Sequence, residues 1–91
     1  MHRTMFYVYV LKSLKDGKYY FGQTNNIEAR IKQHFYGKVL STKSRRPLKL
    51  VGYKTYETRS ESMWMEHKIK THGDQKKKFI NEIFKERPPA P

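Results

Sequence analysis

The sequence predicts an α/β domain of the α+β type, in which three helices flank a three-stranded, mostly antiparallel sheet in the order β-β-α-β-α-α. Short runs of aromatic and β-branched residues, typical of strands, recur along the chain. Asn and Thr residues followed three positions later by Glu mark two helix starts, and glycines and prolines separate the segments. We expect one domain over residues 1–91, with a core over residues 5–86 and a short proline-rich tail over residues 88–91.

The first two predicted strands form a hairpin. Residues 6–12 and 18–22 have strand composition, and Asp16-Gly17 between them is a hairpin-turn signal. A two-residue turn would place Ser13 opposite Tyr20. The side chains of each strand then alternate between two faces of the sheet.

Two tyrosines of this hairpin are candidates for chemistry. The predicted register puts Tyr9 and Tyr20 on one face beside Gly22, while the opposite face is apolar. The simpler interpretation is that both tyrosines are half-buried sheet residues, as strand composition alone would produce.

A helix follows the hairpin. Asn25 would cap it, with Glu28 in a capping box, and Gly37 would end it. The residues expected to form its buried stripe are Ile27, Ile31 and Phe35.

On that helix, Arg30 and His34 lie one turn apart at the edge of the buried stripe. A guanidinium beside an imidazole suits an anion site, because Arg binds phosphate through two parallel hydrogen bonds. The alternative is a solvated Arg and a His that only packs against the sheet.

Residues 38–47 are basic and polar and predict a surface loop. We expect its side chains to contact phosphates of a nucleic acid, although a solvated loop would have the same composition. The phosphate-binding candidates here are Lys43, Arg45 and Arg46.

The remaining elements are a strand over residues 48–56 and two helices. Thr58 and Glu61 form a second capping box, and the helix behind it runs to about Lys70. Gly73 separates it from a last helix. The apolar residues expected to be buried by these two helices are Met65, Ile69, Phe79, Ile80, Ile83 and Phe84.

Glu66 borders the buried stripe of the first of these helices, where a carboxylate could bind a hard divalent cation. The alternative is an i,i+4 salt bridge to Lys70, which itself is a candidate for phosphate binding.

Charge limits the classes of partner. The 91 residues hold 20 Lys and Arg against 8 Asp and Glu, a net charge of +12, and no cysteine. This balance favours a polyanionic partner, nucleic acid before an anionic membrane surface. Without cysteine there is no disulfide framework, thiolate zinc site or cysteine nucleophile. No run of about 18 apolar residues predicts a membrane span, and we expect a cytoplasmic protein.

Five elements in order resemble the GIY-YIG endonuclease domain. Tyr7-Val8-Tyr9, ten further residues and Tyr20-Phe21-Gly22 match the two tripeptides that name this family. Arg30, His34 and Glu66 fall where its remaining motifs lie. The resemblance runs from about Phe6 to Ile83 and is strongest to small stand-alone members, relatives of the incision domain of nucleotide excision repair.

The resemblance implies a phosphodiester hydrolase that uses one divalent cation, Mg²⁺ or Mn²⁺. In such an enzyme Tyr9 and Tyr20 would handle the attacking water, Arg30 would hold the phosphate, His34 would assist and Glu66 would bind the metal. We expect a monomer that acts on nucleic acid, DNA rather than RNA, by recognising structure. A non-catalytic nucleic-acid-binding module and a purely structural interaction domain remain as alternatives.

Overall fold

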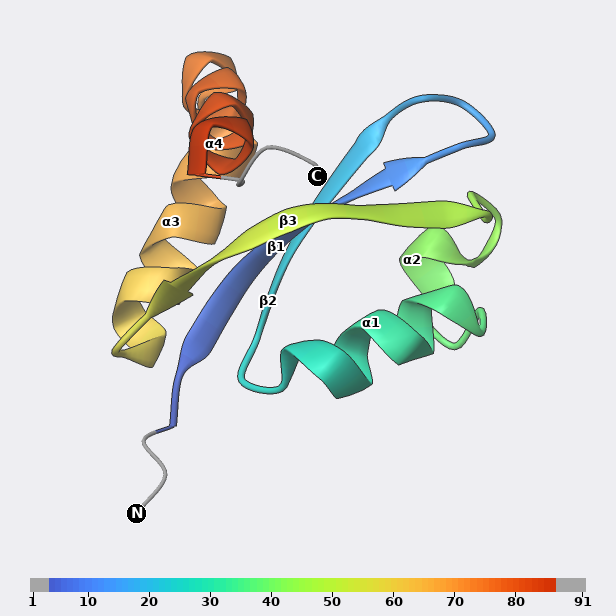
Figure 1. The fold of residues 1–91 in the computed structure, drawn as a ribbon, viewed down its shortest axis with the longest axis horizontal. Coiled ribbons are helices and arrows are strands. Elements are labelled where there is room, and N and C mark those ends of the chain that lie inside the picture. Colours follow the sequence, from blue (N-terminus) through green and yellow to red (C-terminus); the bar gives the residue numbers. More distant parts are fainter. Residues whose placement is uncertain (1–3, 87–91) are drawn as a thin grey trace.

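The computed structural model describes residues 4–86 and confirms the predicted fold class (Figure 1). One antiparallel sheet, in the order β2-β1-β3, is made of β1 (Phe6–Ser13), β2 (Tyr19–Thr24) and β3 (Leu48–Tyr56). The helices are α1 (Ile27–Phe35), the short α2 (Leu40–Lys43), α3 (Arg59–Thr71) and α4 (Gly73–Glu86). The proline-rich tail expected over residues 88–91 lies outside the described residues.

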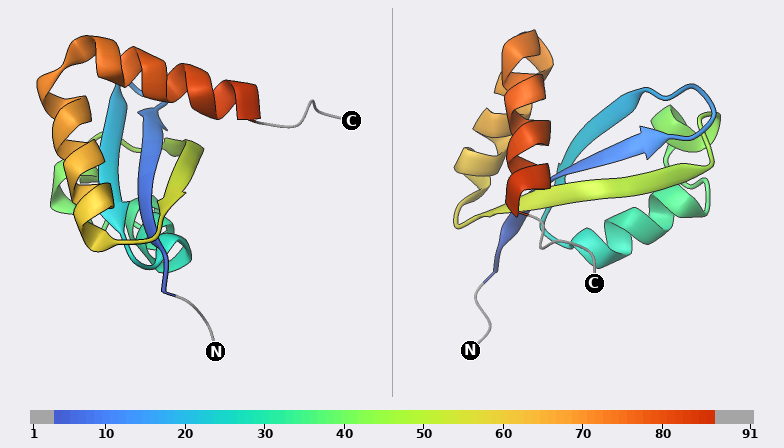
Figure 2. Two further views of the ribbon diagram at one scale, coloured as in Figure 1. Left: turned by 90° about the vertical axis from the view of Figure 1, so that its left-hand side faces the viewer. Right: turned by 45° about the horizontal axis from the view of Figure 1, so that its top comes forward.

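Each face of the sheet carries its own apolar cluster, and different helices cover them (Figure 2). The helices α3 and α4 cover one face, where they bury Val8, Val10, Phe21, Val51, Ile69, Phe79 and Ile83. The helix α1 covers the other face, where Tyr9, Leu11 and Ile31 are buried. Burying both faces of a small sheet supplies the apolar area that a chain of this length needs.

The hairpin register differs from the predicted one, but the faces do not. Leu11, not Ser13, is the partner of Tyr20. The Ser13 side chain accepts hydrogen bonds from the backbone N–H of Lys15 and Asp16, both at 3.2 Å, and this holds a longer loop between the strands. Because the shift is two residues, the alternation of side chains is preserved. Tyr9 and Tyr20 therefore lie on one face, as predicted.

The first helix departs from its predicted cap and stripe. Asn26, not Asn25, caps α1, and its side chain accepts a hydrogen bond of 3.2 Å from the backbone N–H of Ala29. Phe35 is 44% exposed, whereas His34 is fully buried. The imidazole is buried because both of its nitrogens find hydrogen-bond partners inside the protein.

The expected loop over residues 38–47 contains a helix. Val39 and Thr42 are buried beneath α2, so this segment packs against the sheet domain and is not only a solvated loop. On the opposite layer, Phe84 is 51% exposed although it was expected in the stripe of α4. The neighbouring Phe79 and Ile83 are buried as predicted.

The helix α3 begins as predicted, at the cap Thr58, whose hydroxyl accepts from the backbone N–H of Glu61 at 3.2 Å. It runs beside the edge strand β2, as the left view of Figure 2 shows. The first residue of α3, Arg59, lines a cleft together with Arg30 of α1. Within residues 4–86, no helix combines the length and apolar character that a membrane span requires.

Candidate active site

A chain of three hydrogen-bonding side chains forms the buried part of the site. The Tyr9 hydroxyl on the central strand β1 lies 2.8 Å from Nε2 of His34 on α1. The Nδ1 atom of the same ring lies 2.7 Å from the hydroxyl of Thr42 on α2. Tyr9 is 1% exposed, and His34 and Thr42 are not exposed at all. Three elements that are separate in the sequence therefore meet at one imidazole.

Tyr20 and Gly22 complete the sheet side of the site. The Tyr20 ring lies with its centroid 5.4 Å from that of His34. Gly22 is the strand partner of Tyr9. A Cβ atom on Gly22 would lie 2.3 Å from the Tyr9 hydroxyl oxygen, so only glycine lets the phenol cross the edge strand in this way.

Burial and charge set the protonation of these groups. Burial raises the pKa of Tyr9 above its ordinary value near 10, while interaction with the Arg30 side chain lowers it and the nearby Tyr20 and Glu66 raise it. Burial, with a smaller contribution from Arg30, lowers the pKa of His34 to about 4. At neutral pH the site thus holds a protonated phenol and a neutral imidazole.

Glu66 approaches this group from α3. Its side chain is 23% exposed, and its Oε1 lies 3.4 Å from Nζ of Lys70, so the predicted i,i+4 pair forms. Its negative charge nevertheless helps to raise the pKa of Tyr9. Within the part of the chain that the structure describes, no three His, Asp or Glu residues cluster as metal ligands. A single carboxylate fits Mg²⁺, which keeps several waters and binds substrate phosphates rather than an all-protein cage.

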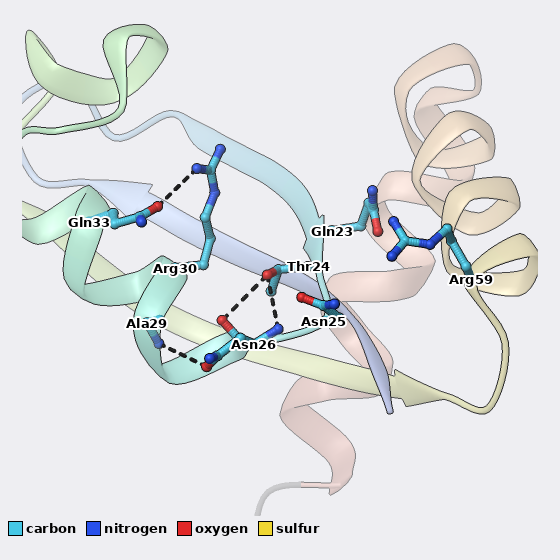
Figure 3. Close-up of a pocket in the computed structure, with 8 residues that line it drawn as sticks. All are labelled: Gln23, Thr24, Asn25, Asn26, Ala29, Arg30, Gln33 and Arg59. Atoms are coloured by element: carbon cyan, nitrogen blue, oxygen red, sulfur yellow. Dashed lines mark hydrogen bonds between the residues drawn. The ribbon is translucent and has the colours of Figure 1, made fainter. Parts of the chain in front are cut away.

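A polar cleft of about 370 Å³ opens beside Arg30 (Figure 3). Arg30 and Gln33 of α1 form one wall, and their side chains are joined by a hydrogen bond of 3.1 Å. Gln23 at the end of β2 and Arg59 at the start of α3 lie on the other side. Two guanidinium groups on opposite walls make this cleft positively charged, and guanidinium groups bind phosphate through paired hydrogen bonds.

The remaining basic candidates lie outside this cleft. Lys43 and Arg46 are exposed, and Arg46 Nε donates a hydrogen bond of 3.1 Å to the backbone oxygen of Lys43. The backbone oxygen of Arg45 accepts from the Ser13 hydroxyl at 2.7 Å. Lys70 is exposed and pairs with Glu66. Their contact with phosphate stays a prediction.

Two residues of the site were given no role from the sequence. Thr42 lay in a segment interpreted as a loop, although Val39 and Thr42 have the three-residue spacing of one helix face. Arg59 directly follows the helix cap Thr58, and its Cζ lies 5.2 Å from the centroid of the Phe6 ring. This contact orients the guanidinium, and no sequence pattern would have indicated it.

Known proteins are similar to this chain in sequence and fold. A UPF0213 protein of Staphylococcus haemolyticus is 46% identical over 78 residues, which cover 84% of this chain and 94% of the relative. A UPF0213 protein of Staphylococcus saprophyticus is 44% identical over 78 residues, with the same coverage. A solution NMR structure of a UPF0213 protein from Bacillus halodurans matches with a TM-score of 0.54 and 34% identity, covering 87% of this chain and 84% of that one.

The family assignment is specific. A family model described as the GIY-YIG catalytic domain matches residues 5–79, which include every hydrogen-bonding group of the site and Glu66. The UPF0213 relatives are small proteins of nearly the same extent. The match over most of the chain, together with these relatives, shows that this chain belongs to the GIY-YIG family, an endonuclease superfamily.

Proposed function

We propose that this chain is an endonuclease that hydrolyses phosphodiester bonds in nucleic acid, DNA in particular, with one divalent cation, Mg²⁺ or Mn²⁺. The observation that supports the proposal best is the buried hydrogen bond between Tyr9 and His34 on a helix whose Arg30 lines the polar cleft.

The charged groups have complementary roles in this proposal. Glu66 would hold the cation, which when bound offsets negative charge on the leaving oxygen. Arg30 would bind the scissile phosphate, and its charge would stabilise the additional negative charge of the transition state. Arg59 would bind the strand on the opposite side of the cleft.

The polar groups would handle the attacking water. The Tyr9 hydroxyl, 2.8 Å from His34 Nε2, would take a proton from the water as its own proton passes to the imidazole. At neutral pH the His34 imidazole is neutral and can accept a proton, but burial and the charge of Arg30 make it a weak base. Tyr20 would orient the water from the neighbouring strand.

The test is nicking of labelled branched, flapped and single-stranded DNA and of matching RNA, with Mg²⁺, with Mn²⁺ and with chelator. We expect cleavage only with metal. Glu66→Gln should abolish cleavage, leave folding intact, and keep or tighten binding, because a negative charge near phosphate is gone. Arg30→Ala should also stop cleavage, and should weaken binding.

Glu28→Gln is a matched control, since Glu28 forms the same kind of i,i+4 pair, 3.5 Å from Lys32, away from the site. It should cleave at the unmodified rate. Metal-dependent cleavage at the original rate by Glu66→Gln would reject Glu66 as the ligand. Tight, salt-sensitive binding without cleavage of any substrate would favour a non-catalytic nucleic-acid-binding module.

A further inference from the structure

The buried imidazole of His34 has two hydrogen-bond partners but only one proton to give. Its Nε2 lies 2.8 Å from the Tyr9 hydroxyl and its Nδ1 lies 2.7 Å from the Thr42 hydroxyl. A neutral imidazole carries one N–H donor and one acceptor nitrogen. One hydroxyl therefore donates to the ring and the other accepts from it.

Donor and acceptor strengths favour one of the two arrangements. A phenol, with a pKa near 10, is a stronger donor than an aliphatic alcohol. The alcohol oxygen is the better acceptor, because the lone pairs of a phenol are delocalised into its ring. Both differences favour a bond from the Tyr9 O–H to Nε2 and a bond from Nδ1–H to Thr42.

We propose that Thr42 is a positioning residue, which accepts a hydrogen bond from Nδ1–H and thereby holds His34 as the tautomer whose Nε2 accepts the Tyr9 proton. The helix α2 holds Thr42 in place, since the backbone N–H groups of Thr42 and Lys43 both bond to the Val39 oxygen, at 3.1 and 2.9 Å. By holding Thr42, the short helix α2 thus fixes which nitrogen of His34 accepts the Tyr9 proton.

The catalytic consequence rests on the proposed nuclease function. The water oxygen forms the new bond to phosphorus as the bond to the leaving oxygen breaks, and that oxygen takes a proton from solvent. The water proton goes to the Tyr9 oxygen, and the phenolic proton goes to Nε2. His34 becomes an imidazolium that still donates from Nδ1 to Thr42, so no buried N–H is left without a partner.

The tautomer is measurable without any substrate. We would record ¹⁵N NMR spectra of the histidine rings of the full chain at neutral pH, with His34→Gln to assign the signals. We expect Nδ1 to be protonated and Nε2 to be unprotonated. A protonated Nε2 in the unmodified protein would overturn the proposal, whether or not any variant folds.

Thr42→Val and Thr42→Ser form a matched pair, because Val keeps the shape of Thr without the hydroxyl and Ser keeps the hydroxyl. Thr42→Val should shift His34 toward the Nε2–H tautomer, and Thr42→Ser should retain the original signals. A folded Thr42→Val variant with an unchanged tautomer would show that Thr42 does not position the ring.

On a substrate that the unmodified protein cleaves, Thr42→Val should lower kcat by about 10-fold or more with little change in KM, since the interaction acts in the chemical step. Thr42→Ser should restore most of kcat. An equal loss in both variants would indicate a structural role only. If no substrate is cleaved, the nuclease proposal fails while the NMR result still decides the tautomer.

Discussion

At the residue scale, the missing side chain of Gly22 leaves the space that the phenol of Tyr9 occupies. Ala at this position would put a Cβ atom 2.3 Å from the Tyr9 oxygen, and the Tyr9 side chain is buried. Gly22→Ala should therefore cost about 1–3 kcal/mol of stability through overpacking. It should also displace the hydroxyl from His34 and stop cleavage.

Chemical denaturation of this variant beside Gly73→Ala checks the prediction. A Cβ atom on Gly73 would meet nothing within 4 Å, so that substitution should be neutral or slightly stabilising. Equal stability of the two variants would contradict the close approach of Tyr9 to Gly22.

His34 makes the fold sensitive to acid. Its pKa is about 4 in the folded protein, against 6.5 for an ordinary histidine, so the unfolded chain binds more protons between these values. The free energy of unfolding should therefore fall as the pH drops from about 6.5 to 4, by about 2–3 kcal/mol from this group. Above pH 6.5 the contribution is constant.

The measurement is urea denaturation from pH 7 to pH 4. His34→Gln should flatten the pH dependence relative to the unmodified protein, whatever its absolute stability. His67→Gln, at an exposed position of α3, should keep the original slope. An unchanged slope in His34→Gln would show that the imidazole is not buried in its neutral form.

At the scale of elements, strands were easier to predict than the packing of helices. The predicted register of the hairpin was wrong by two residues. Strand side chains point to the same face at every second residue, so the prediction that Tyr9 and Tyr20 share a face was still correct. Helix α1 is different. The spacing of its apolar residues predicted that Phe35 is buried. In the structure His34 is buried instead, and its imidazole makes two hydrogen bonds inside the protein.

The short helix α2 was missed for a related reason. Its four residues, Leu40–Lys43, contain one buried side chain, Thr42, and Leu40 is 89% exposed, so no apolar periodicity marks it. The tertiary contact with His34 explains why Thr42 is buried. Residue type and spacing indicated five candidates from the sequence: Tyr9, Tyr20, Arg30, His34 and Glu66. Thr42 and Arg59 reach the site only through the tertiary fold, so no sequence pattern marks them.

At the scale of the whole molecule, the sheet separates two layers that both carry positive charge. The net charge of +12 acts on any polyanion, but Arg30 belongs to the layer of α1 and α2, and the cleft beside it has Arg59 of α3 on its other side. The helix α4 packs on the opposite face of the sheet (Figure 2). Its Lys77 and Lys78 are exposed. If nucleic acid binds along the face of α1 and α2, charge on that side should contribute more to affinity than equal charge on α4.

The contributions of the two layers to binding can be compared by removing two positive charges from each. The double variant with Lys43→Gln and Arg46→Gln should bind nucleic acid more weakly. The slope of the logarithm of its binding constant against the logarithm of the salt concentration should become shallower by about 0.7–0.9 for each phosphate that the protein no longer neutralises. Lys77→Gln with Lys78→Gln removes the same formal charge and should change the slope much less, because long-range attraction is screened within about 10 Å at 0.1 M salt. Titrations of labelled DNA with chelator present, at several salt concentrations, keep cleavage from affecting the result. Equal slopes for the two double variants would mean that the bound strand does not follow the α2 side of the sheet.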